Sequence, residues 1–68
     1  NNRLTSNLRI LGASLVEVGQ LDEAAAIVGQ HLKVAPHFRL QPWLKRTPLS
    51  HALREKVAAN LRRVGMPD

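Results

Sequence analysis

Apolar residues recur at helical spacing along the first quarter of the chain. They follow one another at intervals of four, three, four and three residues: Leu4, Leu8, Leu11, Leu15 and Val18. This spacing predicts an amphipathic helix over residues 3–18 with one apolar stripe. Gly12 costs that helix about 1 kcal/mol relative to alanine, which indicates close approach of a second helix. Gly19 is expected to end the helix, because glycine adopts the left-handed cap conformation without strain.

A second helix is predicted over residues 22–34. Asp22 is the expected N-cap, and Glu23 places negative charge in the first turn, where it complements the helix dipole. The expected inner side is apolar and consists of Leu21, Ala24, Ile27, Val28 and Leu32. Pro36 closes the unit, since the residue before a proline is disfavoured in helical geometry. The short gap after Gly19 predicts an antiparallel helical hairpin.

The rest of the chain is predicted to be helical in two pieces. A short turn near residues 39–45 is followed by an ordered loop, and Trp43 is expected to anchor in the core. A longer helix over residues 51–64 begins at Ser50 as N-cap, or at Thr47 with a proline in the first helical position. Its stripe is expected to be Leu53, Val57, Leu61 and Val64. Gly65 is expected to end it.

Composition favours an all-α fold. The 68 residues are 44% hydrophobic, dominated by leucine, alanine and valine, with one Phe, one Trp and no Tyr. Strands favour aromatic and β-branched side chains, so close-packed helices suit this composition better. The absence of cysteine excludes disulfides and thiolate chemistry. A chain of this length forms one small domain with a limited core.

The formal net charge is +5. Such an excess favours acidic partners, and a basic helical module that binds nucleic acid is the alternative function. However, no run of like charge exceeds two residues, and aromatic side chains for base stacking are scarce. The basic residues are therefore expected mainly on solvated helix surfaces. No apolar run approaches the ~20 residues of a membrane span and no signal peptide is recognised, so a cytoplasmic location is expected.

No catalytic, metal or cofactor site is predicted. His31 and His37 are separated by a proline and do not share a helix face. His51 and Glu55 could meet on one face, but two ligands do not make a zinc site. The serines and threonines have no evident His and Asp partners, and no glycine-rich phosphate loop is present.

The segment 5–38 resembles one tetratricopeptide repeat, a helix–turn–helix unit of about 34 residues. The residues at its signature places are Leu8, Leu11, Gly12, Leu15, Gly19, Ala24, Val28 and Pro36. Leu8 and Leu15 replace aromatic residues that are common in the family. His31 stands where a small residue is usual, which suggests a loosely packed site or a displaced neighbouring helix.

The resemblance implies a single C-terminal unit over residues 1–68. It comprises one repeat (5–38), a connection (39–49) and a capping helix with a tail (50–68). Residues 61–68 resemble the C-terminal end of bacterial class III adenylate/guanylate cyclases that carry such repeats, or of winged-helix transcriptional regulators. Because the chain opens without methionine, we expect it to be the end of a longer regulatory protein.

The resemblance also implies a non-catalytic role in protein–protein contact or oligomerisation. In this family the first helices line a concave groove, so the candidate partner-binding residues are Ser6, Arg9, Ala13, Val16 and Glu17. The partner would be a second copy, the upstream repeats or a peptide. The alternative is that this face packs on a preceding repeat or is solvated. Self-association through residues 3–18 is expected, with Ile10 and Val16 as candidates.

Overall fold

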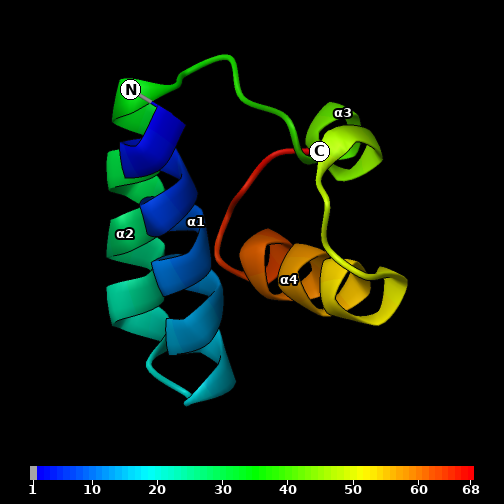
Figure 1. Ribbon diagram of the computed structural model, residues 1–68. Helices are drawn as coiled ribbons and strands as arrows, with labels where there is room; N and C mark the ends of the chain where they lie inside the picture. The colour runs from blue at the N-terminus through cyan, green and yellow to red at the C-terminus, as the bar shows by residue number, and fades with distance from the viewer. Residues whose placement is uncertain (1) are drawn as a thin grey trace.

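The computed structural model describes residues 3–68 in full and the backbone of residue 2. These residues form four helices: α1 (Asn2–Glu17), α2 (Leu21–Val34), α3 (Leu40–Arg46) and α4 (His51–Arg63) (Figure 1). No strand occurs within residues 2–68, so the predicted all-α class is confirmed. Each helix begins and ends within one residue of the bounds that the sequence predicts.

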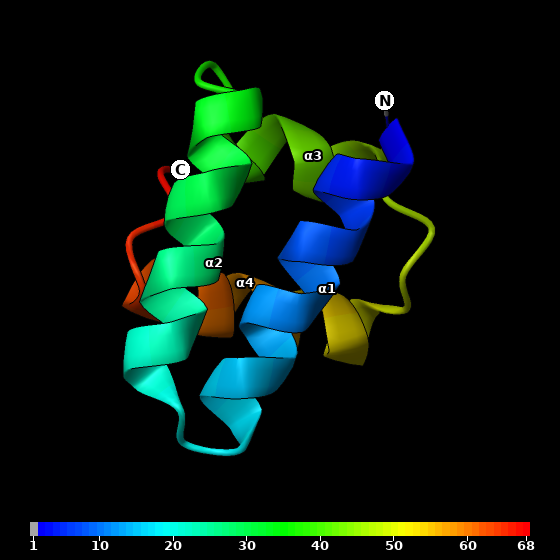
Figure 2. The same ribbon diagram turned by 90° about the vertical axis from the view of Figure 1, so that its left-hand side faces the viewer.

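Helices α1 and α2 lie side by side in opposite directions and form the predicted hairpin (Figure 2). Gly19 at the turn has a φ of 83°, in the left-handed region that favours glycine. A Cβ on Gly12 would lie 3.4 Å from Val28 Cγ2 and 3.5 Å from Leu61 Cδ2. The predicted close approach at Gly12 is thus confirmed, and both α2 and α4 make it.

The beginning of α2 differs from the prediction. Helical geometry starts at Leu21, Gln20 occupies the N-cap position, and its side chain makes no cap hydrogen bond. Asp22 is therefore not the N-cap, because the turn at Gly19 reverses the chain within two residues. Asp22 and Glu23 instead lie in the first turn, where their charges still complement the helix dipole.

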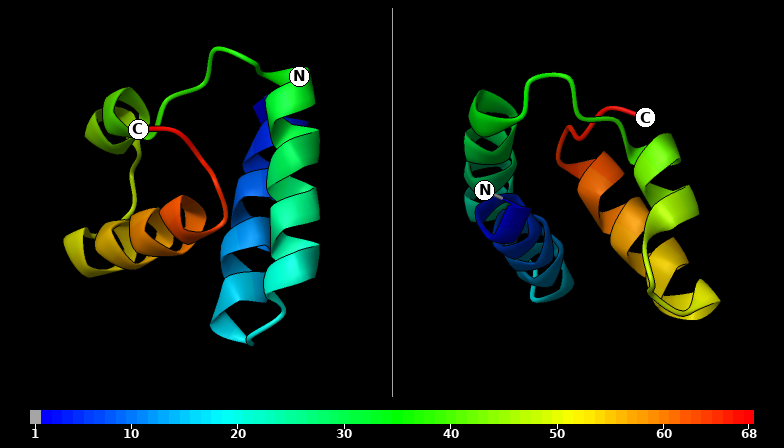
Figure 3. Two further views of the ribbon diagram at one scale, coloured as in Figure 1. Left: turned by 180° about the vertical axis from the view of Figure 1, so that it is seen from behind. Right: turned by 45° about the horizontal axis from the view of Figure 1, so that its top comes forward.

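Helix α4 runs across the hairpin rather than along it (Figure 1), and its C-terminal part lies nearest to α1 and α2 (Figure 3). Ser50 is the N-cap, and its Oγ accepts a hydrogen bond from the Leu53 backbone N–H at 3.4 Å. Leu53 is 47% exposed, contrary to the predicted stripe, because the first turn of α4 projects away from the hairpin. Ala58 is buried in addition to Val57 and Leu61.

The C-terminal tail returns to the beginning of α3 (Figure 3, right). The Leu40 N–H donates to the Pro67 carbonyl at 2.9 Å, and the Gln41 N–H donates to the Asp68 carbonyl at 3.0 Å. These carbonyls satisfy N–H groups that the first turn of a helix leaves unpaired. Met66 of the tail is buried in the hydrophobic core. The tail is therefore part of the packed structure.

The apolar stripe predicted for residues 3–18 is not the buried side of α1. Leu4, Leu11 and Val18 are 49%, 45% and 69% exposed. Ala13 and Val16 are only 5% and 7% exposed. The reason is tertiary: the chain after α2 folds back over the small residues of α1, and Leu4, Leu11 and Val18 stay exposed within residues 3–68.

Candidate functional site

The C-terminal half of the predicted concave face is covered by the chain itself. Ala13 and Val16 are buried. Asn60 Nδ2 of α4 donates hydrogen bonds of 3.1 Å to the Ala13 carbonyl and to Glu17 Oε1. Lys56 Nζ lies 3.3 Å from Glu17 Oε2, and the hydrogen bond from Asn60 and the ammonium of Lys56 lower the pKa of Glu17. This half of the face therefore contacts α4.

The N-terminal half remains accessible and centres on Arg9. Its guanidinium lies 3.1 Å from both His31 Nε2 and Ser6 Oγ. The guanidinium carbon also lies 5.0 Å from the ring centroids of Phe38 and Trp43. Both distances fall within the range of cation–π attraction. The sequence pointed to Arg9 and Ser6 but not to these aromatic partners. The one feature that could have indicated them is that Phe38 and Trp43 both lie in the segment that follows the hairpin.

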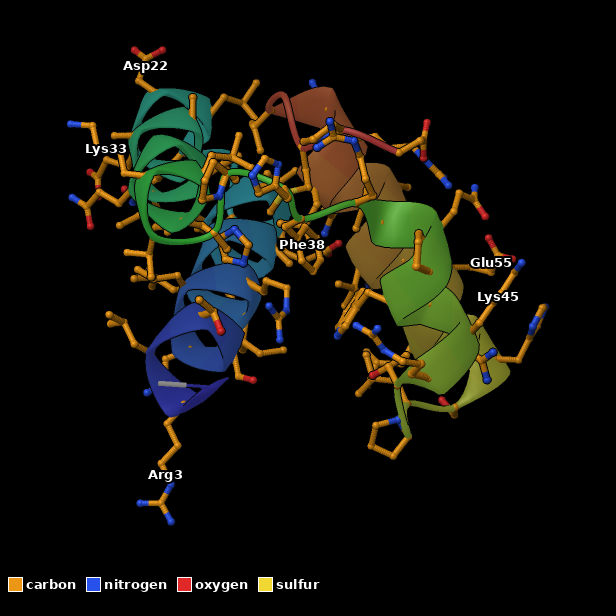
Figure 4. All side chains as sticks on the ribbon, turned by 90° about the horizontal axis from the view of Figure 1, so that it is seen from above. Arg3, Asp22, Lys33, Phe38, Lys45 and Glu55 are labelled. Carbon is orange, nitrogen blue, oxygen red and sulfur yellow. The ribbon has the colours of Figure 1, made fainter. Side chains whose placement is uncertain are left out.

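His31 is completely buried beside Phe38, in a T-shaped contact with centroids 4.8 Å apart. Phe38 in turn lies 6.1 Å from Trp43, between the hairpin and the α3–α4 pair (Figure 4). Burial lowers the pKa of His31, and the positive charge of Arg9 lowers it further. Because the guanidinium only donates, Nε2 must accept and the proton of the neutral ring lies on Nδ1. Among the described residues Nδ1 finds no acceptor.

His31 thus fills the site where a repeat usually has a small residue. Its ring packs edge-on to Phe38 and does not leave a loosely packed position. The connection between α2 and α3 passes over it, and Leu40 then enters the core. The bulky residue at this place is therefore accommodated by the aromatic ring that follows the hairpin.

Two adjoining depressions flank Arg9, Trp43 and Arg46. One, of about 380 Å³, continues past Ile10 towards residues 47–49. The other, of about 630 Å³, continues towards Phe38 and residues 34–35. Both volumes lie within the range of small-ligand sites, roughly 300–1,000 Å³. No carboxylate among the described residues lines either depression.

The second accessible feature is the leucine face, defined as Leu4, Leu8, Leu11 and Leu15 of α1 together with Val18, which directly follows the helix. Leu4, Leu11 and Val18 are exposed, whereas Leu8 and Leu15 are half-buried. The face points away from Ala13, since residues two positions apart on a helix project in nearly opposite directions. At about 1.5 Å per residue, it extends along most of a helix some 24 Å long. Exposed apolar patches on a protein surface are typical of contact sites.

The residues that carry the repeat resemblance differ in burial: Leu8 and Leu15 are half-buried, and Gly19 is exposed at the turn. Gly12, Ala24 and Val28 are buried where α1 and α2 pack together. Leu11 and Pro36 are exposed, at the leucine face and after the end of α2. Gly12, Ala24 and Val28 pack α1 against α2, whereas Leu4, Leu11 and Val18 of the leucine face remain exposed.

Within residues 3–68, no three His, Asp or Glu side chains gather as a metal site would require. None of the described helices combines the length and apolar character needed to span a bilayer. No protein-family model, curated protein or solved structure matches this chain. Its function is therefore argued from the geometry of the two accessible features.

Proposed function

We propose that this chain is a non-catalytic helical module that contacts another protein through the leucine face. The observation that carries the proposal is the exposure of Leu4 and Leu11 on one side of α1, and of Val18 directly after the helix. The opposite side is already occupied by α4. Complete burial of a leucine or valine side chain stabilises a contact by about 1.5–3 kcal/mol, so covering this face favours association.

The hairpin of α1 and α2 is proposed to be one tetratricopeptide-like repeat. Repeats of this kind bury their apolar faces against neighbouring repeats. The leucine face is then the surface on which a preceding repeat or a second copy packs. Val16 is buried within the chain and is therefore no longer a candidate. Ile10 is 48% exposed but lines the depression next to residues 47–49, so the proposed contact uses the leucine face.

The identity of the parent protein rests on the resemblance of residues 61–68 alone. A cytoplasmic bacterial regulator with a cyclase or winged-helix module upstream remains our proposal. Sequencing the gene upstream of residue 1 tests it: a cyclase or winged-helix module would support the proposal, and a different upstream module would contradict it.

Sedimentation equilibrium of the chain tests the contact itself. Wild type should be associated at high micromolar concentration, as expected for an interface gaining a few kcal/mol from leucine burial. Leu11→Glu should shift the chain to monomer, because it places a carboxylate in the middle of the contact. Ala59→Glu, with the same added charge on the exposed side of α4, should associate as wild type does.

Two results would contradict the proposal. One is a folded wild-type monomer at high micromolar concentration, and the other is association of Leu11→Glu equal to that of wild type. Circular dichroism of each variant confirms that the helices remain intact. Tight binding to arbitrary duplex DNA that weakens steeply with salt would instead favour the basic nucleic-acid-binding alternative.

A further inference from the structure

Arg9 carries a positive charge that no anion of the described residues balances. Its guanidinium contacts the neutral His31 and Ser6, together with the faces of two aromatic rings. Its Nε is shielded from solvent and has no acceptor among the described residues. A partly buried cation is costly unless it is paired, and aromatic faces compensate only part of its charge.

Arg46 brings a second positive charge to the same place. Both arginines line both of the depressions described above. Burial lowers the pKa of Arg9 and the charge of Arg46 lowers it further, so the two cations repel each other. An anion between them would replace this repulsion with two attractions.

The described carboxylates are engaged or lie elsewhere. Glu17 pairs with Lys56, and Asp68 Oδ1 lies 2.7 Å from Arg62 Nε. Asp22 and Glu23 lie at the turn end of the hairpin (Figure 1). Glu55 lies on the side of α4 that faces away from the hairpin (Figure 4). The anion would therefore come from outside the described residues.

Hydroxyl groups complete the surroundings of the two arginines. Ser6 lines both depressions; its Oγ accepts a hydrogen bond from Arg9, so its own proton is available to an incoming oxygen. Thr47 lines one depression and Thr5 lines the other. Donors thus approach from α1 on one side and from the end of α3 on the other.

We propose that the groove between α1 and α3 binds a phosphate monoester, with Arg9 and Arg46 as its charge partners and Ser6 as an additional donor. A phosphate monoester carries about −1.5 to −2 charges and three acceptor oxygens, which donors on both sides can share. A carboxylate has two oxygens in one plane, which a single guanidinium fork satisfies. Two arginines that line the same groove from α1 and from α3 therefore favour phosphate over carboxylate.

The indole N–H of Trp43, the only tryptophan of the chain, reports on this groove in ¹H–¹⁵N NMR spectra. Inorganic phosphate and phosphoserine should each shift the Trp43 signal saturably, whereas sodium chloride of equal ionic strength should not. Equal affinity for both supports free phosphate or a small ester as the natural ligand. Tighter binding of phosphoserine supports a phosphorylated protein segment.

Arg46→Gln should weaken phosphate binding about tenfold or more, the loss expected for one charge-assisted contact of ~1.4 kcal/mol or more. Arg46 is exposed, so the fold should be retained. Lys45→Gln is the matched control: it removes the same charge one residue earlier, on the side of α3 away from the groove (Figure 4), and should bind as wild type does.

Three results would overturn the proposal: no saturable shift up to about 10 mM phosphate, an equal response to chloride, or equal losses in both variants. Leu11→Glu should bind phosphate normally, because the leucine face is separate from the groove. This site can therefore fail without the contact proposed for α1 failing, and the reverse also holds.

Discussion

The two sides of α1 differ in a way that side-chain size alone would not predict. The side with Gly12, Ala13 and Val16 is buried, whereas the side with Leu4 and Leu11 is largely exposed. Small residues let the backbones of α2 and α4 come close, as the contacts of Gly12 show. The larger side chains remain outside this packing. Burial within the chain therefore follows the close approach of helix backbones, and the exposed leucines are available to another surface.

The largest expected effect compares one substitution on the two sides. Leu61 is fully buried where α4 meets the hairpin, and Leu11 is on the leucine face. Leu61→Ala should lower the free energy of unfolding by about 2–5 kcal/mol, because it leaves a cavity. Leu11→Ala should lower it by about 0.5 kcal/mol or less in the monomer. Urea unfolding at low protein concentration measures the free energy of unfolding of both variants. Equal losses of stability would contradict the assignment of the buried and exposed sides.

Overpacking the small side is expected to have the next largest effect. Ala13→Leu forces a large side chain between α1 and α4 and should cost about 1–3 kcal/mol of stability. Ser14→Leu is the control, since Ser14 is exposed one position further along the same helix and should tolerate the change. Thermal unfolding of the two variants measures the difference. If the two variants have the same melting temperature, the side of α1 with the small residues is not closely packed.

The buried ring of His31 predicts a dependence of stability on pH. Its folded pKa is lowered from an ordinary value near 6.5, so the unfolded chain binds the proton more strongly. The contribution of His31 to the free energy of unfolding is fully present above about pH 6.5. It is lost as the pH falls towards the folded pKa, by no more than ~1.4 kcal/mol per pH unit.

Unfolding measured between about pH 5.5 and 7 isolates this contribution from most carboxylate titration. His31→Gln should flatten the dependence, whereas the exposed neighbour variant His37→Gln should retain it. An unchanged slope in His31→Gln would show that another group is responsible.

The smallest effect concerns the polar contacts that close α4 over α1. Asn60→Ala removes the hydrogen bonds to the Ala13 carbonyl and to Glu17, and should cost about 1 kcal/mol. Lys56→Ala removes only an exposed ion pair and should cost about 0.5 kcal/mol or less. Chemical unfolding ranks the two variants. The reverse order would mean that α4 is held by surface charge.

Local features of the fold could be predicted because neighbouring residues determine them. Gly19 and Gly65 have positive φ values at the ends of α1 and α4, as their positions suggested. Ser50 caps α4, and Gly12 marks the close approach of α2. Asp22 was misplaced because the position of the turn, and not the capping residue, decides where α2 begins.

The buried side of α1 could not be predicted from its own pattern. Five large apolar residues defined the stripe, but burial depends on α4, whose Asn60 contacts Ala13 from 47 positions along the chain. Val16, off the stripe, indicated a second apolar side without showing which one the chain covers. The aromatic partners of Arg9 were missed for the same reason, since α3 brings Trp43 to it through tertiary packing.

Intermolecular NOEs in a mixture of isotope-labelled and unlabelled chains test the contact role of the leucine face most directly. Methyl groups of Leu4, Leu11 and Val18 should show cross-peaks to the other copy, because these are the exposed members of the face. Leu53, which is exposed on α4, should show none. Intermolecular cross-peaks from Leu53 with none from α1, or no intermolecular cross-peaks at millimolar concentration, would contradict the proposed contact.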